Sequence, residues 1–117
     1  MTHEEKKTAK IVEELTMFFF ALGASQIHSQ IEKRDAEAVI TFQADYDPVY
    51  AYKLENLDQY LNGHKNDGME DIYWGLAGSG DPGETNQLLL VGLMTDRAEI
   101  NIDENHVKLI LYKELLD

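Results

Sequence analysis

The hydrophobic pattern of this chain begins with an amphipathic helix. Near the N-terminus Thr2 and Glu5 stand three residues apart, the spacing of a capping box that starts a helix. Gly23 then supplies the left-handed backbone conformation with which many helices end. Between these signals four apolar residues recur at helical spacing and share one buried face: Ile11, Leu15, Phe18 and Leu22.

Two later segments alternate apolar and polar residues with a period of two, which predicts β-hairpins. Residues 27–32 alternate, a turn is expected at 33–35, and the returning strand places Ala38, Ile40, Phe42 and Ala44 on one face. Residues 98–102 and 107–111 repeat the pattern around a turn at 103–105. Such alternation is typical of a sheet with one covered and one wetter face.

Two further helices are expected between the hairpins. Asp47 as N-cap and Pro48 at the first helical position predict a helix that ends at Gly63. Thr85 is expected to cap another helix from Asn86 to Met94. Residues 64–71 are polar and predict a mobile loop, whereas 72–77 are apolar but too short to assign to strand or helix. The stripe of the first of these helices consists of Tyr50, Leu54, Leu57 and Leu61.

The order of elements predicts the fold class. A helix, a hairpin, a helix, a loop, a helix and a second hairpin favour an α+β two-layer sandwich. We expect a mixed or mainly antiparallel sheet of about four to five strands with about three helices on one face. The 117 residues indicate one domain over 1–117.

Composition narrows the possible partners. The net charge is −12, from 22 acidic and 10 basic side chains. Such a surface repels phosphate backbones, so nucleic acid and anionic membranes are not favoured. The chain has no cysteine, which excludes disulfides and thiolate metal sites. No apolar region follows the N-terminus directly, and the most apolar stretch, Leu15 to Leu22, is too short to span a membrane and is preceded by acidic residues, so a cytoplasmic location is expected.

Candidate chemistry is sparse. Gly78 to Thr85 reads G-x-x-x-x-G-E-T, a phosphate-loop pattern in which Glu84 replaces the lysine that reaches the phosphates. A carboxylate reverses the sign of that interaction, so a surface loop is the simpler interpretation, although backbone amides at the next helix could hold an anion. The four histidines are scattered, and no metal site is predicted. Trp74 fits either a core position or a ring that lines a binding surface.

Element order and local motifs together resemble a known family. Glu14 on a helix, followed by Ala-Leu-Gly-Ala-Ser-Gln-Ile at 21–27, is similar to the first conserved box of histidine-kinase-type ATPase domains of the GHKL superfamily. The hairpin ends at Asp45-Tyr46-Asp47, where the family places an Asp-x-Gly sequence that holds adenine. Residues 64–83 would be the nucleotide lid and glycine box, and the last helix and hairpin resemble the closing elements. The resemblance implies nucleotide-binding positions at Asp45, Asp47, Gly78, Gly80 and Gly83.

The sequence departs from the family pattern at its chemical centre. The family carries an asparagine that holds magnesium four residues after the glutamate, and here Phe18 stands in that place. An aromatic ring cannot coordinate a cation that requires oxygen ligands. The Asp-x-Gly sequence has lost its glycine to Asp47, and Asp81 and Glu84 add negative charge where phosphates would lie.

Three functions therefore remain open. The first is a degenerate ATPase-type domain that lacks catalytic residues and a metal and serves as a binding or regulatory module in bacterial-type signalling, with a protein partner or by self-association. The second is a working ATP- and magnesium-binding domain of a sensor histidine kinase or an anti-sigma-factor-type serine kinase. The third is an unrelated α+β module that binds a protein or small ligand around Trp74.

Overall fold

The first helix begins and ends where the sequence predicts. In the computed structural model, which describes residues 1–63 and 85–116, helix α1 spans His3–Ala21. Thr2 and Glu5 form the expected capping box, in which each side chain bonds the other's backbone N–H at 3.0 and 2.9 Å. Gly23 follows the helix with φ +84°, the conformation that glycine adopts without steric cost.

In the part of the chain that the structure describes, four antiparallel strands form one sheet in the order β1-β2-β4-β3. They are β1 (Ile27–Arg34), β2 (Glu37–Asp45), β3 (Arg97–Asp103) and β4 (His106–Glu114). Each hairpin keeps its two strands adjacent, and the hairpins meet at the pair of β2 with β4. The predicted α+β class and the antiparallel sheet are both confirmed.

The hydrogen bonds of the sheet alternate from one residue to the next. Asp45 N–H donates to Gln26 O at 3.3 Å, towards β1, whereas Tyr46 N–H donates to Asn105 O at 3.2 Å, towards the β3–β4 hairpin. In an antiparallel ladder this alternation continues along the strand. Odd-numbered residues of β2 therefore bond to β1, and even-numbered residues bond to β4.

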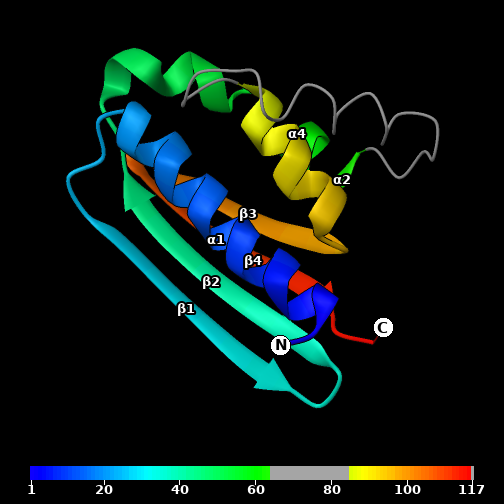
Figure 1. Ribbon diagram of the computed structural model, residues 1–117. Helices are drawn as coiled ribbons and strands as arrows, with labels where there is room; N and C mark the ends of the chain where they lie inside the picture. Colours follow the sequence, from blue (N-terminus) through cyan, green and yellow to red (C-terminus); the bar gives the residue numbers. More distant parts are fainter. Residues whose placement is uncertain (64–84, 117) are drawn as a thin grey trace.

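Helices cover one face of the sheet (Figure 1). Helix α1 lies over β2, α4 (Thr85–Met94) runs beside it, and β1 forms an edge beyond α1. Phe18 and Phe19 meet edge to face at 5.2 Å between ring centroids, and Phe19 packs on Phe42 at 5.6 Å. Burial of this apolar surface provides most of the driving force for folding. The largest fully buried residues are Phe18, Phe19, Phe42, Ile11, Leu15, Leu22, Ile40, Leu57, Leu61, Leu88, Leu109 and Leu111.

The predicted single helix from Pro48 to Gly63 is wrong in its continuity. A 3₁₀ helix, η1, spans Pro48–Leu54, and a separate α-helix, α2, spans Leu57–Asn62. Leu54 and Leu57 stand three residues apart, a spacing that fits the three-residue period of a 3₁₀ helix as well as an α-helical stripe. Both leucines are buried, so the packing is satisfied without a continuous helix.

Two smaller expectations also change. The first hairpin turns at Asp35 and Ala36 rather than at 33–35, with Asp35 at φ 54°. Helix α4 begins at Thr85, one residue earlier than expected. The expected loop at 64–71, the apolar stretch 72–77 with Trp74, and the glycines of 78–83 lie outside the described residues. No helix in the described ranges is long and apolar enough to cross a membrane.

Candidate functional site

Asp45 closes the turn that joins α1 to β1. It is the last residue of β2, and its Oδ1 accepts the backbone N–H of Ser25 at 2.7 Å and of Gln26 at 3.0 Å. Its Oδ2 accepts the hydroxyl of Ser25. These bonds, first that of the Ser25 hydroxyl, lower the pKa of Asp45 below its ordinary value. Both carboxylate oxygens are thus already engaged within the chain.

Asp47 connects the end of α1 to η1. Its side-chain Oδ1 accepts Val49 N–H at 3.1 Å, which confirms the predicted N-cap. Its backbone N–H donates to Leu22 O at 2.9 Å. A Cβ at Gly23 would lie 3.1 Å from the Asp47 Cβ, so the two segments meet closely there. Asp47 stands where the resembling family has glycine, and in this chain it performs a capping role.

Tyr46 points into the protein between these two aspartates. Its side chain is buried, and its hydroxyl donates to Glu104 O at 2.9 Å, in the turn of the β3–β4 hairpin. Asp45, Tyr46 and Asp47 therefore fasten three separate segments: the α1–β1 turn, the β3–β4 turn and the end of α1. The three residues form a structural junction at one end of the sheet.

Glu14 lies at the contact of α1 with α4. It is 7% exposed, and its carboxylate pairs with Lys10 Nζ at 3.0 Å and accepts Gln87 Nε2 at 3.1 Å. The same bond to Glu14 raises the pKa of Lys10. A buried carboxylate needs such partners because an unpaired charge is costly away from water. Glu14 thus holds the two helices together through a polar contact.

Phe18 belongs to the core. Its side chain is completely buried and packs on Phe19. It offers no oxygen or nitrogen atom, so the position four residues after Glu14 cannot provide a cation ligand. The remaining predicted positions, Gly78, Gly80 and Gly83, lie outside the described residues. Glu14 and Asp45 contact different segments: α4 for Glu14 and the α1–β1 turn for Asp45.

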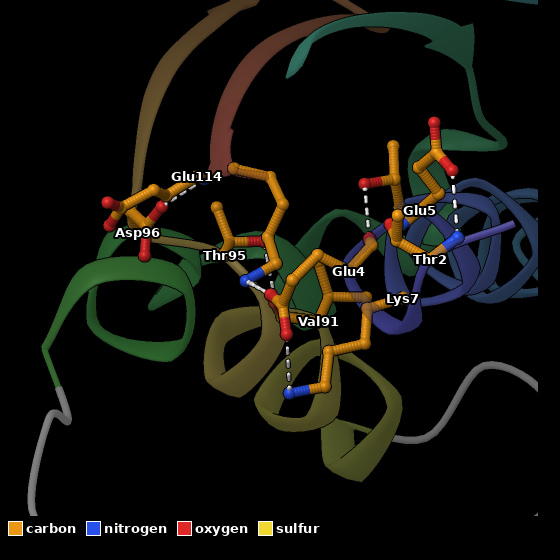
Figure 2. Close-up of polar contacts among 10 residues, drawn as sticks. Thr2, Glu4, Glu5, Lys7, Val91, Thr95, Asp96 and Glu114 are labelled. Atoms are coloured by element: carbon orange, nitrogen blue, oxygen red, sulfur yellow. Dashed lines mark hydrogen bonds and ion pairs between the residues drawn. The ribbon is translucent and has the colours of Figure 1, made fainter. Parts of the chain in front are cut away.

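A lysine–glutamate network at the start of α1 is the main feature that sequence reasoning missed. Lys33 of β1 and Lys113 of β4 flank Ala38 of β2 and face the helix layer. Lys113 Nζ pairs with Glu4, and Lys33 Nζ lies 2.8 Å from Glu5. Lys33 is the largest influence that lowers the pKa of Glu5 to about 2. Figure 2 shows the two glutamates in this first turn, with Thr2 bonded to Glu5 and Lys7 near Glu4.

The signal for this network was present in the sequence. Strand alternation places Lys33 on the same face as Ile31, and Lys113 on the same face as Leu111. A lysine on a covered face requires an anionic partner, and the acidic first turn of α1 is the nearest source. Beside the network, a cavity of about 110 Å³ opens between α1 and β1, lined mainly by apolar atoms of Ala9, Ile31, Ala38 and Leu115.

No family model matches the sequence, and neither a curated protein nor a solved structure matches the chain. Within 1–63 and 85–116, no three histidine, aspartate or glutamate side chains gather closely enough to hold a metal ion.

Proposed function

We propose that this chain is a degenerate histidine-kinase-type ATP-binding domain that acts as a binding or regulatory module in bacterial-type signalling. Support comes first from the element order, in which a helix and a hairpin are followed by helical segments and a closing hairpin over one antiparallel sheet. This is the order on which the resemblance rests. The proposal gives the chain a protein partner and no metal-dependent phosphoryl transfer.

The observation that carries the proposal is the environment of Phe18. Four residues after Glu14, the resembling family has a magnesium-binding asparagine, and this chain has a fully buried aromatic ring. Phosphoryl transfer from ATP depends on a metal that neutralises the developing charge on the phosphates. Without an oxygen ligand at this position the expected magnesium site is incomplete.

The environments of two carboxylates support the same conclusion. Glu14 is engaged by Lys10 and Gln87, so a free carboxylate is not presented at this position. Asp45 uses both oxygens to close the turn at Ser25 and Gln26. Glu14 and Asp45 therefore each have a structural role that explains their presence without a nucleotide.

A thermal melt with and without millimolar ATP, ADP and magnesium tests the proposal. A ligand at about 100 times its dissociation constant adds roughly 2.7 kcal/mol to the free energy of unfolding. For a domain of about 100 residues this raises the melting temperature by roughly 10 °C or more. We expect no magnesium-dependent rise. A rise of that size would overturn the loss of metal–ATP chemistry and favour a working kinase-type domain.

Asp45→Asn is the matched control for that experiment. The carboxamide oxygen can still accept the N–H groups of Ser25 and Gln26, and its NH₂ can face the Ser25 hydroxyl, so the turn is retained without the charge. If nucleotide raised the melting temperature of the parent chain but not that of Asp45→Asn, adenine would be placed at this residue. That result would contradict a purely structural role for Asp45.

A further inference from the structure

The outer edge of β1 carries backbone hydrogen-bonding groups that no other part of the described ranges bonds. Because odd-numbered residues of β2 bond to β1 in the register Ile27↔Ala44, the even-numbered residues of β1 supply the matching groups. The odd-numbered residues of β1 therefore direct N–H and C=O outward. Within 1–63 and 85–116, no hydrogen bond reaches those outward groups. They belong to Ile27, Ser29, Ile31 and Lys33.

The side chains along this edge do not block the approach of another strand. Lysines often protect edge strands by blocking approach, but the amine of Lys33 is directed to Glu5 of α1 at 2.8 Å. Ile31 is 46% exposed and borders the cavity between α1 and β1. Phe20, 62% exposed, continues the flank of α1 that carries Glu5, Ala9 and Thr16 at helical spacing.

Charge also favours this edge as the place where two acidic chains can meet. The whole chain carries −12, so most of its surface repels a second copy. Strand β1 has two cations, Lys33 and Arg34, against one carboxylate, Glu32. Strand β3, at the opposite edge, has one cation, Arg97, against two carboxylates, Glu99 and Asp103.

We propose that β1 pairs antiparallel with β1 of a second copy of this chain, which joins two sheets into one of eight strands. A two-fold axis makes the same surface serve both copies. Only odd-numbered residues of β1 present outward backbone groups, so an odd-numbered residue of one copy must face an odd-numbered residue of the other. In an antiparallel pair the numbers of any two facing residues add to the same sum, which must therefore be even. A sum of 60 pairs Ile27 with Lys33 and Ser29 with Ile31, and uses almost the whole strand.

This register is self-complementary on the open face of the sheet. His28 of each copy lies opposite Glu32 of the partner subunit, which gives two equivalent pairs. The two Gln30 carboxamides meet on the two-fold axis. A sum of 62 would instead place His28 opposite Arg34, and a sum of 58 would leave Lys33 and Arg34 with no facing residue in strand β1 of the partner subunit. Cross-strand pairs of opposite polarity stabilise a sheet, whereas like charges that face each other destabilise it.

The first test is the mass of the full chain in solution. Sedimentation equilibrium over about 5–500 µM should show a transition from the 13.4 kDa monomer to a dimer. A chain that remains monomeric over the whole range overturns the proposal. Ser29→Pro removes an outward N–H without removing a bond to β2, so it should retain the melting profile of the fold and raise the dissociation constant at least about tenfold. An unchanged constant in a folded Ser29→Pro variant also overturns it.

His28 offers a matched pair of variants that tests the register. His28→Glu would set a carboxylate against Glu32 of the partner subunit at two symmetric points, and should weaken the dimer by about tenfold. His28→Lys would set an amine there and should strengthen it. The opposite order of affinities is the result expected for a sum of 62, and it would overturn the register proposed.

Engineered cysteines give an independent readout because the chain has none of its own. In the proposed dimer Gln30 faces itself in a non-hydrogen-bonded pair, where the separation of the Cα atoms suits a disulfide. Gln30→Cys should form a covalent dimer on mild oxidation, whereas Ser29→Cys and Ile31→Cys should not. Cross-linking by either control in preference to Gln30→Cys overturns the register. These measurements use no nucleotide, so their failure is distinct from failure of the proposed function.

Discussion

The sheet has two edge strands of similar length, and within 1–63 and 85–116 the rest of the chain bonds outward backbone groups of β3 but none of β1. At β3, the even-numbered residues direct their backbone groups outward, and the side chain of Asn62 bonds both groups of Ala98. Its Oδ1 accepts Ala98 N–H at 2.8 Å, and its Nδ2 donates to Ala98 O at 3.0 Å. The carboxamide thus replaces one residue of a neighbouring strand.

At β1 an ion pair ties the strand to the helix layer. Lys33 pairs with Glu5 of α1, which holds a side chain but leaves the outward backbone groups of the strand unbonded in the described ranges. Edge strands in monomeric proteins are commonly covered or blocked because open edges promote association. Within the described ranges, Asn62 therefore caps β3 at Ala98, whereas β1 keeps all of its outward backbone groups available for a further strand.

Gln30→Pro should produce the largest loss of stability among changes at the open edge. Gln30 N–H bonds β2 opposite Thr41, so proline removes a ladder bond and orphans its partner, at a cost of about 2–3 kcal/mol. Ser29→Pro, one residue away, should cost less than about 1 kcal/mol because its N–H points outward. Urea unfolding of both variants measures the difference. Equal losses would contradict the alternation on which the comparison depends.

Lys113→Met should cost more than Lys33→Met, although both lysines flank Ala38. The side chain of Lys113 is 10% exposed and pairs with Glu4, whereas that of Lys33 is 62% exposed. Removing the buried amine takes from Glu4 the nearer of its two described lysine partners and leaves Lys7, at 3.5 Å, so it should cost about 2 kcal/mol. Removing the exposed amine should cost less than about 1 kcal/mol. Denaturant midpoints that reverse this order would show that the exposed pair of Lys33 with Glu5 stabilises the fold more than the buried pair of Lys113 with Glu4.

Asn62→Ala removes the cap on β3 at Ala98 and should cost about 1–2 kcal/mol, because both partly buried groups of Ala98 lose their partner. Asn62→Asp keeps an acceptor for Ala98 N–H, but it sets a carboxylate oxygen against Ala98 O and against Asp58 Oδ1, which the Asn62 amide bonds at 2.7 Å, so its loss should be at least as large as that of Asn62→Ala. Urea midpoints compare the two variants with the parent chain. If Asn62→Ala unfolded at the same urea concentration as the parent chain, the carboxamide would not stabilise the edge at β3.

The pair of Glu5 with Lys33 should give the smallest effect, and one that depends on pH. The pKa of Glu5 is lowered to about 2 from 4.5, so its stabilising contribution is fully present above pH 4.5. That contribution is lost as pH falls from 4.5 through about 2. The difference in melting temperature between the parent and Glu5→Gln should therefore be constant above pH 4.5 and shrink below it. A difference in melting temperature that grows towards low pH would show that ionised Glu5 does not stabilise the fold.

The sequence was sufficient for those elements whose signals are local. The capping box at Thr2 and Glu5, the end of α1 at Gly23, the cap at Asp47 and the alternating faces of both hairpins all follow from residues within a few positions of one another. The break between η1 and α2 was missed because buried leucines three and four residues apart fit more than one helical geometry. The apolar pattern alone does not distinguish one continuous α-helix from a 3₁₀ helix followed by a short α-helix.

The candidate site was less predictable because its contacts are distant in sequence. Asp45 meets a serine twenty positions earlier, and Glu14 meets Gln87 seventy-three positions later. No spacing rule reveals that Asp45 would close a turn or that Glu14 would bridge two helices. The role of Asp45 as an adenine ligand stays a prediction, as do the roles of Gly78, Gly80 and Gly83.

The central pairing of β2 with β4 has a consequence for the folding rate. Asp45 opposes His106, so the middle of the sheet closes a loop of about half the chain, whereas each outer pair is a short hairpin. Contacts between residues far apart in sequence slow folding because the entropy of loop closure must be lost before they form. The two hairpins should therefore gain structure early, and docking of β2 on β4 should limit the rate at which the native sheet appears.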